Sequence, residues 1–482
     1  MKTLFGQSVP GRRGVRPPRR DVPTTINIRP ALLRAAPPRL PELSELDVVR
    51  HFTRLSQRNF GVDSHFYPLG SCTMKYNPKI AEEVGRLEGF ADLHPLLPQL
   101  RLGGMLTQGA LEVLYETDRL LSEVTGMAAF TLQPMAGAHG ELTGIMIMAA
   151  YHHDRGNKKT TILIPDSAHG TNPASAAIAG CQVVTVPSDE RGLMDMEALR
   201  GAVDDSVAGL MLTCPNTVGL FNGNIREICD LIHSVDGLVY YDGANLNAIV
   251  GKARPGDFGF DIVHLNLHKT FATPHGGGGP GSGPVGVVDR LAEFLPISLV
   301  VKREDGTFAL EYDRPKSIGY IAPFYGNFLV ILRAWAYALM LGREGFERVA
   351  ENAVLNANYL RVRLAGHYDL PYAGVCKHEC VFSASRQAAN GVHALDVAKG
   401  LIDAGMHPPT VYFPLIVKEA LMIEPTETES KETLDAFVEV MIEIARAAER
   451  DPERLKCAPR TMPVTRLDEA RAARSLALCD LE

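Results

Sequence analysis

The sequence predicts an α/β protein whose main domain holds a mostly parallel, doubly wound sheet, with a smaller α+β domain toward the C-terminus. From about residue 125 onward, short apolar runs rich in β-branched residues alternate with stretches of helical periodicity. The runs lack the period-two pattern of half-exposed strands, so we expect both faces of the sheet to be covered. Strand–helix alternation of this kind is typical of doubly wound parallel sheets.

The expected elements follow in order along the chain. Helical patterns lie at 141–153, 195–203 and 223–235, and a longer one at 327–341 is expected to lead into the C-terminal domain. We therefore expect an extended basic arm over 1–64, a large α/β domain over 65–340 and a small α+β domain over 341–482. The expected strands are 128–131, 161–165, 182–186, 208–213, 238–241, 261–265 and 285–288.

The N-terminal segment is basic and rich in proline. Its first 34 residues carry eight Lys and Arg side chains against the single acid Asp21. Closely spaced prolines prevent a helix, so the chain should run extended there. Such an arm is either a solvated tail or a segment that becomes ordered on a partner subunit. A mitochondrial targeting peptide is disfavoured, because the prolines would destroy its amphipathic helix.

Composition excludes several classes of function. A chain of 482 residues predicts two or three folded units, and its net charge of −7 argues against general nucleic-acid binding. No stretch approaches the roughly 20 apolar residues that span a bilayer, and the N-terminus lacks the apolar core of a signal peptide. The eight cysteines are scattered without C-x-x-C spacing. That distribution is typical of reduced thiols, so we expect a cytoplasmic protein.

One cysteine-containing motif could supply half of a metal site. It reads Cys376-Lys377-His378-Glu379-Cys380. A structural metal usually takes four protein ligands, and no second cluster in the sequence completes the set. We therefore expect no metal.

Lys269 stands just after the expected strand 261–265, beside His268 and Thr270. Ligands of open α/β sheets bind beyond the carboxyl ends of the strands. A Lys in that place can be an amine nucleophile toward a carbonyl cofactor, and partial burial favours the neutral amine that this chemistry needs. Taken alone, a single Lys is more often a solvated charge, so its interpretation depends on the neighbouring strand ends.

Two other strand ends carry polar side chains that could converge with this Lys. Asp242 follows strand 238–241, where a carboxylate can pair with a protonated pyridine nitrogen and keep the ring an electron sink. The alternative for Asp242 is an ordinary cap or loop hydrogen bond. His169 follows strand 161–165, where an imidazole can stack on a cofactor ring, although a lone loop His is more often incidental.

Two glycine-containing loops remain. Residues 133–141 join a strand to a helix, and free N–H groups near Gly137 and Ala138 could bind phosphate, although such loops also occur without a ligand. Gly276, Gly278 and Gly281 fit the dinucleotide pattern G-x-G-x-x-G. That run precedes a strand and contains a proline, so it does not open a helix as a dinucleotide fingerprint requires. A loop beside the Lys explains it better.

Together these motifs resemble fold-type I pyridoxal-phosphate enzymes and, more narrowly, the glycine decarboxylase family of the glycine cleavage system. Residues 69–78 near the front, Leu-Gly-Ser-Cys-Thr-Met-Lys-Tyr-Asn-Pro, also look like that family. The matched segments span residues 65 to 283. The other matching segments are Leu267-His268-Lys269-Thr270-Phe271, the glycine run after His275, Asp242-Gly243-Ala244-Asn245 and Ser167-Ala168-His169-Gly170-Thr171-Asn172.

The resemblance implies roles for individual residues. Lys269 would form the Schiff base with pyridoxal 5'-phosphate, Asp242 would meet the pyridine nitrogen and His169 would lie over the ring. The backbone near Gly137 and Ala138 would hold the phosphate. His268 is a further candidate for cofactor binding. Candidates for the substrate pocket, by their place in the matched motifs, are His65, Ser71, Cys72, Thr73 and Asn245.

The resemblance also implies an activity and partners. The family decarboxylates glycine, releases CO2 and transfers the aminomethyl group to the lipoyl arm of the H-protein. This chain is about half as long as single-chain members, which implies a homologous partner subunit without the Lys, in an α2β2-type assembly. The arm with Gly11-Arg12-Arg13-Gly14 looks like the start of the bacterial second subunit.

Other readings remain open. An aminotransferase or another fold-type I amino-acid decarboxylase would keep Lys269 and Asp242 but act on a different substrate. A non-catalytic scaffold subunit should lack the Lys, and a dinucleotide-dependent dehydrogenase lacks its glycine context. The sequence does not decide whether Cys72 is regulatory or packed, nor where the lipoyl arm enters.

Overall fold

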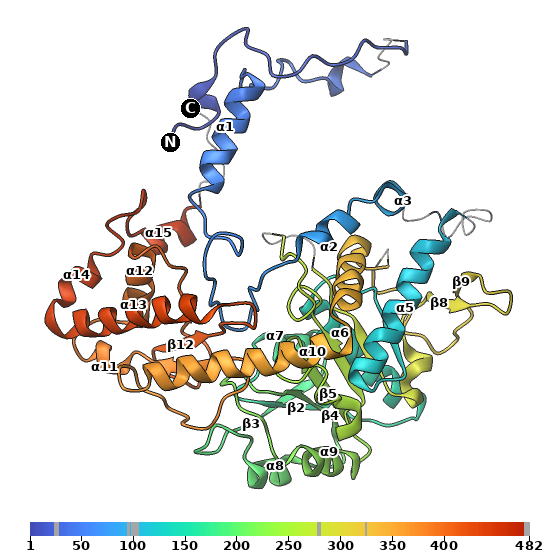
Figure 1. Ribbon diagram of the computed structural model, residues 1–482. Coiled ribbons are helices and arrows are strands. Elements are labelled where there is room, and N and C mark those ends of the chain that lie inside the picture. Colours follow the sequence, from blue (N-terminus) through green and yellow to red (C-terminus); the bar gives the residue numbers. More distant parts are fainter. Residues whose placement is uncertain (24–27, 94–96, 98–105, 277–280, 323–324, 477–482) are drawn as a thin grey trace. The chain divides into compact units, whose positions relative to one another are not determined.

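The computed structural model describes residues 1–23, 28–93, 97, 106–276, 281–322 and 325–476 (Figure 1). The chain divides into two compact units. One comprises Met1–Gly61 with Pro463–Glu482, and the other is Val62–Met462. None of the helices within the described ranges is both long enough and apolar enough to cross a membrane.

The larger unit, Val62–Met462, contains a seven-stranded sheet in the order β1-β7-β6-β5-β4-β2-β3. The pairs β2–β3, β2–β4, β4–β5 and β5–β6 are parallel, and β7 runs antiparallel to both of its neighbours. This confirms the mostly parallel sheet that the sequence predicts. The strands are β1 Ala129–Thr131, β2 Thr161–Pro165, β3 Gln182–Val186, β4 Val207–Thr213, β5 Leu238–Gly243, β6 Ile262–Leu265 and β7 Val285–Val287.

Both faces of the central strands are buried. Along β5, Val239 and Tyr241 pack into one hydrophobic cluster and Tyr240 packs into another on the opposite face. This explains why the apolar runs lack alternation. The outermost strand β3 differs, since it has a neighbour on one side only and Gln182 at its start is exposed. The expectation that both faces are covered therefore fails for this edge strand.

Helices and a hairpin surround the sheet (Figure 1). Helix α6 packs against β4 to β7, and α9 packs against β4 and β5. The helices of this part are α2 Lys79–Val84, α3 Glu88–Ala91, α5 Gln108–Thr125, α6 Gly137–Asp154, α7 Thr171–Ile178, α8 Met196–Ala202 and α9 Ile225–His233, with 3-10 turns at Pro255–Phe258 and Asp289–Phe294 and a hairpin of β8 Leu299–Lys302 and β9 Phe308–Glu311.

Helix α10, Phe328–Leu364, leads from the large sheet to the C-terminal part. It continues well beyond the predicted helix 327–341. Gly342 interrupts it with φ +59° and ψ −173°, immediately after the predicted end. That positive φ suits a glycine, so the backbone bends there before the helix resumes.

The C-terminal part has its own sheet and core. The sheet is antiparallel, in the order β10-β12-β11, and packs with α12 and α13 around a separate hydrophobic cluster. Because each part has its own sheet and its own core, we propose that the chain divides into a large and a small domain near residue 340. The elements are β10 Cys380–Ser383, α11 Ser385–Ala388, α12 Ala394–Asp403, β11 Thr410–Val411, β12 Ala420–Ile423, α13 Lys431–Arg450 and α14 Pro452–Lys456.

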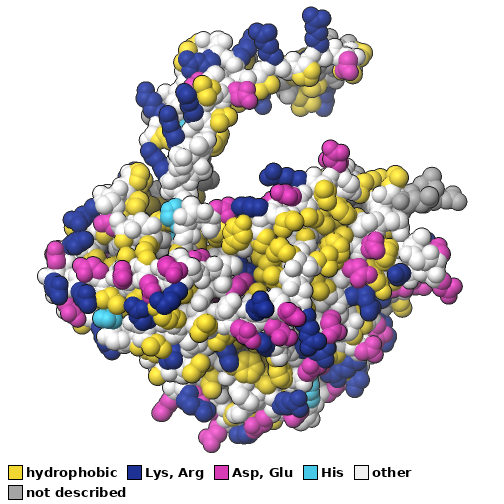
Figure 2. Space-filling model, in the orientation of Figure 1, with side chains coloured by type: hydrophobic (Ala, Val, Ile, Leu, Met, Phe, Trp, Pro, Cys, Tyr) yellow, Lys and Arg dark blue, Asp and Glu magenta, His cyan; other side chains and the backbone are white. Residues whose placement is uncertain are grey.

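The smaller unit holds the basic N-terminal arm. Its first 34 residues contain only the 3-10 turns Phe5–Gln7 and Pro30–Leu32 among the positions described, and Figure 2 shows Lys and Arg side chains along it in dark blue. The arm is not extended throughout, because α1 spans Glu45–Ser56. The prolines end at Pro41, and Ser44 caps the helix by accepting the Asp47 N–H at 3.1 Å. A short helix, α15 Glu469–Arg474, belongs to the same unit.

Candidate active site

A cavity of about 310 Å³ opens at the carboxyl ends of β4, β5 and β6. Thr213 ends β4, Asp242 lies at the end of β5 and Lys269 follows β6. Thr73 and His65 are not among the residues that line the cavity. The structure brings these sequence-predicted residues together in its wall: Lys269, His169, Asp242, Gly137, Ala138, His268, Ser71, Cys72 and Asn245.

Asp242 is almost completely buried, with 4% of its surface exposed. Its carboxylate accepts hydrogen bonds from Asn172 Nδ2 at 3.2 Å, from Thr213 Oγ1 at 3.3 Å and from the Ala244 N–H at 3.1 Å. Burial raises the pKa of Asp242, but His264, the Ala244 N–H, Lys269 and Asn172 together more than offset it, so the pKa lies below its usual value. Asp242 is therefore a charged carboxylate at the base of the cavity.

His264 supports that charge without carrying one itself. It is fully buried, and burial lowers its pKa to about 4. Its Nδ1 lies 2.5 Å from the Tyr240 hydroxyl, and its Nε2 faces the Asp242 carboxylate, which can only accept. The carboxylate therefore favours the tautomer in which the tyrosine donates to Nδ1 and the proton of the neutral ring is on Nε2. That nitrogen lies 3.6 Å from Asp242 Oδ1 and turns an N–H dipole toward the carboxylate.

Lys269 is half-buried in the wall of the cavity. It sits in a tight turn after β6, where its own N–H donates to the Asn266 carbonyl at 3.0 Å. Among the residues that the structure describes, its amine makes no hydrogen bond or ion pair. Its charge acts on Asp242, on Glu141 and on other groups around the cavity. The amine is therefore available to a ligand.

His169 lies in the loop between β2 and α7 and lines the same cavity. Its Nδ1 is 2.8 Å from Thr171 Oγ1, and its ring meets Phe413 edge-on with centroids 5.6 Å apart. Loss of solvent around the ring lowers the pKa of His169, so the imidazole is neutral at pH 7. The ring is thus fixed on one side by Thr171 and on the other by an aromatic neighbour.

The first turn of α6 closes one end of the cavity. Ala136, which precedes the helix, has no side-chain hydrogen bond to it, and Gly137 and Ala138 line the cavity. A Cβ at Gly137 would approach Asn266 Nδ2 to 2.7 Å, so a side chain fits there only if the Asn266 amide or the loop moves. N–H groups at a helix start with no capping side chain are suited to an anion.

His268 and His275 connect the Lys269 turn to the segment around Cys72. Their rings meet edge-on with centroids 5.0 Å apart, and His275 Nε2 lies 2.8 Å from the Cys72 carbonyl oxygen. Burial lowers the pKa of His268 to about 3 and that of His275 to about 4, so both are neutral. Gly276, which opens the glycine run, has φ +70°, and the run leads into β7 as expected, while Gly278 lies outside the described residues.

The turn with Ser71 and Thr73 is held by two buried glutamates that the sequence analysis missed. Glu379 accepts the Ser71 N–H at 3.0 Å, and Glu424 accepts the Thr73 N–H at 3.0 Å. Glu379 precedes β10 and Glu424 follows β12, and the register Cys380↔Ile423 places the two side by side. Ser71 and Thr73 both have positive φ, at 67° and 52°, so these hydrogen bonds stabilise an unusual backbone.

Both glutamates lie in surroundings that disfavour charge. Burial, and then the nearby Glu424, raise the pKa of Glu379 well above its usual value. Burial raises the pKa of Glu424 to about 7, although its hydrogen bonds with Thr73 and Asn245 act in the opposite direction. At neutral pH the pair therefore holds at least one proton.

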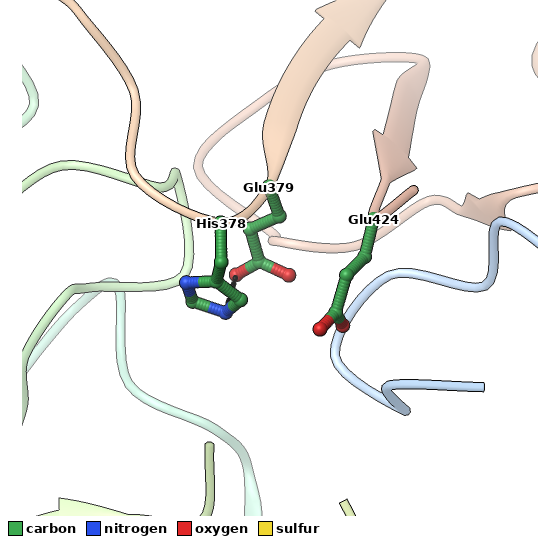
Figure 3. Close-up of side chains that lie close together, drawn as sticks. All are labelled: His378, Glu379 and Glu424. Carbon is green, nitrogen blue, oxygen red and sulfur yellow. Dashed lines mark ion pairs between the residues drawn. The ribbon is translucent and has the colours of Figure 1, made fainter. Parts of the chain in front are cut away.

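Figure 3 shows His378 beside these two glutamates, with one ring nitrogen toward the carboxyl groups. One ligand atom from each of the three residues lies within 4.8 Å of the others, a spacing that could hold a metal ion. Three of the four carboxyl oxygens already accept hydrogen bonds. The side chains of the Cys376-to-Cys380 motif do not gather at one place: its two cysteines pack into the core of the small domain, whereas His378 and Glu379 line the cavity.

The remaining substrate-pocket candidates differ in position. Asn245 lines the cavity and donates to Glu424 Oε1 at 2.7 Å and to the Thr73 hydroxyl. Thr73 is 1% exposed and lies behind the wall, where its hydroxyl donates to Glu424 at 2.8 Å. His65 Nδ1 shares a hydrogen bond with the neighbouring Ser64 hydroxyl at 2.8 Å, and His65 does not line the cavity.

Glu141 is a further cavity residue that the sequence analysis did not single out. It lies in α6 one turn after Gly137, so it shares the face that points to the cavity. That spacing of four residues was a signal in the sequence. Glu379 and Glu424 gave no comparable local signal, because they lie more than 300 residues from the turn that they hold.

Two family models match the chain. The model described as glycine cleavage system P-protein matches residues 19–312, and the one described as glycine dehydrogenase, C-terminal domain, matches residues 349–458. Together they cover most of the sequence. The chain belongs to the glycine cleavage system P-protein family. As the sequence analysis expected, the match includes every motif at the cavity from the Ser71 turn to the Lys269 turn.

Curated P-protein relatives match over nearly their full length. A protein from Caldanaerobacter subterraneus subsp. tengcongensis, named probable glycine dehydrogenase (decarboxylating) subunit 2, is 56% identical over 98% of this chain and 97% of its own. One of the same name from Listeria welshimeri has the same identity, with 98% and 97% covered. Another, from Bacillus velezensis, is 56% identical over 98% of this chain and 96% of its own. The chain is therefore similar, over nearly its whole length, to curated subunits of this second type.

Solved structures agree on the fold. A glycine decarboxylase (P-protein) in inhibitor-bound form has a TM-score of 0.71 at 20% identity, covering 87% of this chain and 93% of that one. A sphingosine-1-phosphate lyase from Burkholderia pseudomallei has a TM-score of 0.62 at 16% identity, covering 88% and 94%. These neighbours confirm the fold-type I class that the sequence predicts.

Proposed function

We propose that this chain is the Lys-bearing subunit of a glycine decarboxylase and that Lys269 binds pyridoxal 5'-phosphate. The observation that carries the proposal is the pairing in one cavity of an available amine, Lys269, with a buried and ionised carboxylate, Asp242. An aldehyde cofactor with a basic ring nitrogen needs that combination. The family supports glycine as the substrate and a lipoyl disulfide as the acceptor of the aminomethyl group.

The residues of the cavity fit the cofactor. Asp242 would hold the ring nitrogen, the first turn of α6 would hold the phosphate and Lys269 would hold the aldehyde carbon. Several buried polar atoms near the cavity have no partner in the described structure, among them Asn172 Oδ1, Asn266 Oδ1 and Glu141 Oε2. Such orphaned atoms are typical of a site built around a polar ligand.

When bound, the cofactor supplies an electron sink for the pair of electrons left when CO2 departs. The chain's own residues prepare the site for that step. Asn172 and Thr213 fix the Asp242 carboxylate, and burial keeps water away from it. His169 and Asn245 line the space beside Lys269 and offer polar atoms that could orient a substrate carboxylate. The neutral His268 and His275 add no competing positive charge.

We also propose that the chain works with a homologous subunit without the Lys and with a lipoylated H-protein. The name subunit 2 of the curated relatives supports a partner subunit. The cysteines within the described residues are free thiols, which supports a reducing compartment such as the cytoplasm. An assay of the full activity therefore needs the partner chains.

The test has two arms. The purified full-length chain is loaded with pyridoxal phosphate, reduced with borohydride and digested, and the modified peptide is identified by mass spectrometry. We expect the cofactor on Lys269, no labelling in Lys269→Ala, and normal labelling in the surface variant Lys252→Ala. Exchange of labelled bicarbonate into glycine, in the presence of partner subunit and H-protein, then tests the substrate. Cofactor on another lysine would refute the site, and amino transfer to a keto acid instead of exchange would favour an aminotransferase.

A further inference from the structure

Lys75 is a charged side chain that lies almost completely inside the protein, with 2% of its surface exposed. Its amine pairs with Glu427 Oε1 at 2.7 Å, and both side chains are buried. Burial lowers the pKa of Lys75, but Glu427 and Tyr337 more than offset this, so the amine is charged at neutral pH. Because a buried ion pair adds little net stability by itself, its role is to be sought in the segments that it joins.

The three protons of the Lys75 ammonium go to three different parts of the fold. One goes to Glu427, which follows β12 in the small domain. The others go to the Tyr337 hydroxyl on α10 at 3.3 Å and to Asn247 Oδ1, after β5, at 3.4 Å. Asn247 Nδ2 also donates to Glu427 Oε2 at 3.3 Å. An ammonium group can only donate, so these four residues, the Lys75 cluster, depend on its charge.

Thr73, Glu424 and Asn245 form a second set of contacts nearer the cavity. Each of these three lies two or three residues before a member of the Lys75 cluster, so the same three segments meet twice. The two sets are connected, because the Asn247 N–H donates to Asn245 Oδ1 at 2.8 Å. Asn245 lines the cavity, so the Lys75 cluster reaches the cavity wall through one hydrogen bond.

The main chain that Lys75 anchors is the turn at the cavity wall. Ser71 and Thr73 have φ values of 67° and 52°, which non-glycine residues keep only where surrounding contacts hold them. The Lys75 N–H donates to the Thr73 carbonyl at 2.9 Å, so the turn ends at the anchored residue. Ser71 and Cys72 line the cavity, whereas Lys75 does not. A movement of Lys75 therefore reaches the cavity through this turn.

We propose that Lys75 is a positioning residue whose buried ammonium, bonded to both domains at once, fixes the Ser71 turn and Asn245 in the cavity wall. The two loops then keep their places beside Lys269 when the cavity is empty as well as when it is filled. An apolar side chain at position 75 would leave Glu427 buried without its cation, and would leave Asn247 without a donor. The wall should then open toward solvent.

The Cys72 thiol reports the position of the turn. It lines the cavity, and burial raises its pKa, so the folded protein should react slowly with iodoacetamide. The full-length chain is alkylated without added cofactor, and mass spectrometry follows the peptide that contains Cys72. We expect Lys75→Met, which keeps the length of the side chain, to raise the rate at Cys72 about tenfold or more, as the loss of buried hydrogen bonds implies. An unchanged rate would overturn the proposal.

Arg290→Met is the matched control. Arg290 also pairs with a buried carboxylate, that of Asp261, but Asp261 precedes β6 and lies at the opposite end of that strand from the Lys269 turn. This variant should lower the melting temperature and leave the rate at Cys72 near that of the wild type. If Arg290→Met raises the rate as much as Lys75→Met does, the effect is a general loosening of the fold and the proposal fails.

A double variant keeps the test decisive if Lys75→Met folds poorly. Lys75→Met combined with Glu427→Gln leaves no buried charge without a partner, so it should recover most of the lost melting temperature. Its rate at Cys72 should stay above that of the wild type, because Asn247 and Tyr337 still lack the ammonium. Recovered stability together with a wild-type rate would show that the pair only stabilises the fold.

Bicarbonate exchange with the partner subunit and H-protein gives the functional arm, which rests on the proposed function. A displaced wall should weaken substrate binding more than the chemical step, so we expect Lys75→Met to raise KM for glycine about tenfold and to change kcat by less than about threefold. A fall in kcat at an unchanged KM would contradict a role in the substrate pocket. Absence of exchange in the wild-type assembly would instead refute the proposed function, and the alkylation result would still decide the role of Lys75.

Discussion

Asp242 and Glu141 line the same cavity and differ in protonation state. Both are nearly buried, at 4% exposed each, yet the pKa of Asp242 is lowered and that of Glu141 is raised to about 8. Asp242 receives three hydrogen bonds, whereas one oxygen of Glu141 has no partner among the described atoms. Two like charges in one buried site are unfavourable, so the carboxylate that receives more hydrogen bonds keeps the charge. The negative charge of the cavity is thereby concentrated at Asp242.

Replacing Asp242 by Asn removes that charge while keeping the size of the side chain. We expect Asp242→Asn still to bind the cofactor, because Lys269 and α6 are untouched, but to lose roughly a hundredfold or more in kcat, the order expected when a preorganised charge is removed. Visible absorbance measures cofactor content, and bicarbonate exchange measures turnover. Asp236→Asn is the control, since Asp236 pairs with Arg155 outside the cavity. Near-normal turnover in Asp242→Asn would contradict the proposed role.

A side chain at Gly137 should disturb the first turn of α6. An added methyl group would lie 2.7 Å from Asn266 Nδ2, so either the buried Asn266 amide or the first turn of α6 must shift. We expect Gly137→Ala to weaken pyridoxal-phosphate binding by about tenfold or more, because the N–H groups of that turn lose their alignment. Equilibrium titration of the full-length chain measures the affinity. Gly201→Ala, where a methyl group meets open space, should bind as the wild type does.

At the scale of elements, the paired ends of β10 and β12 hold the Ser71 turn. The carboxyl groups of Glu379 and Glu424 accept hydrogen bonds from the main-chain N–H groups of Ser71 and Thr73, which would otherwise need water as a partner. Leu69 also forms a β-bridge with Ile423 of β12. The small domain therefore shapes the cavity wall that Ser71 and Cys72 line. Because the two carboxyl groups lie side by side in a buried place, this support depends on their protonation.

Glu424 makes stability depend on pH in a predictable direction. Its folded pKa of about 7 is above the ordinary value of 4.5, so the folded chain binds the proton more tightly than the unfolded chain does. Its contribution is therefore most favourable below about pH 4.5 and is lost as the pH rises to about 7. The full loss is on the order of 3 kcal/mol.

Glu424→Gln removes this titration. Any cost of the amide in the hydrogen bonds to Thr73 and Asn245 is the same at each pH. We therefore expect the free energy of unfolding of the variant to rise relative to that of the wild type between about pH 5 and about pH 8. Urea denaturation at a series of pH values measures it. A constant difference between the two proteins would show that Glu424 does not titrate in this range.

The bend in α10 gives a prediction about the backbone alone. Gly342 has φ +59°, and a methyl group there would meet no other atom within 4 Å. Gly342→Ala should therefore destabilise the protein by about 1 kcal/mol through backbone strain without any clash. Gly366→Ala, also in open space and with no positive φ, is the matched control. Thermal unfolding compares the two, and an equal melting temperature would contradict the strain.

At the scale of the whole molecule, the cavity joins parts that are distant in sequence. Its wall takes Lys269 and Asp242 from the large sheet and His378 and Glu379 from the small domain. A ligand bound there should stabilise both parts together. At a hundredfold excess over the dissociation constant, pyridoxal phosphate should add about 2.7 kcal/mol and shift a single cooperative transition in calorimetry. Lys269→Ala should show a smaller shift, and separate transitions for the two parts would contradict the coupling.

Much of the large domain was predictable because its signals are local. The runs at 161–165 and 182–186 coincide with β2 and β3, since parallel strands, whether central or at the edge, leave an apolar segment between turn residues. The same logic placed Lys269, Asp242 and His169 at strand ends, which the sheet gathers at one edge. The predicted helix 327–341 ends just before Gly342, where the backbone of α10 bends.

What could not be predicted depends on contacts between distant segments. Glu379 and Glu424 meet the Ser71 turn only after the small domain folds, so no pattern near either residue reveals the contact. His65 belongs to a matched motif but is not brought into the cavity wall, because a motif does not specify which of its side chains turn inward. Helix α1 was not predicted, because the proline-rich sequence before it led us to expect an extended chain over all of residues 1–64.

The bridge between Leu69 and Ile423 has a consequence for synthesis on the ribosome. Strand β12, which contains Ile423, emerges from the ribosome more than 300 residues after the segment around Leu69 with which it pairs. A nascent chain that has already exposed Lys269 still lacks Glu424, so the cavity around Lys269 stays open to solvent until translation is nearly finished. Such late, long-range closure slows folding and leaves the N-terminal segment unprotected in the meantime.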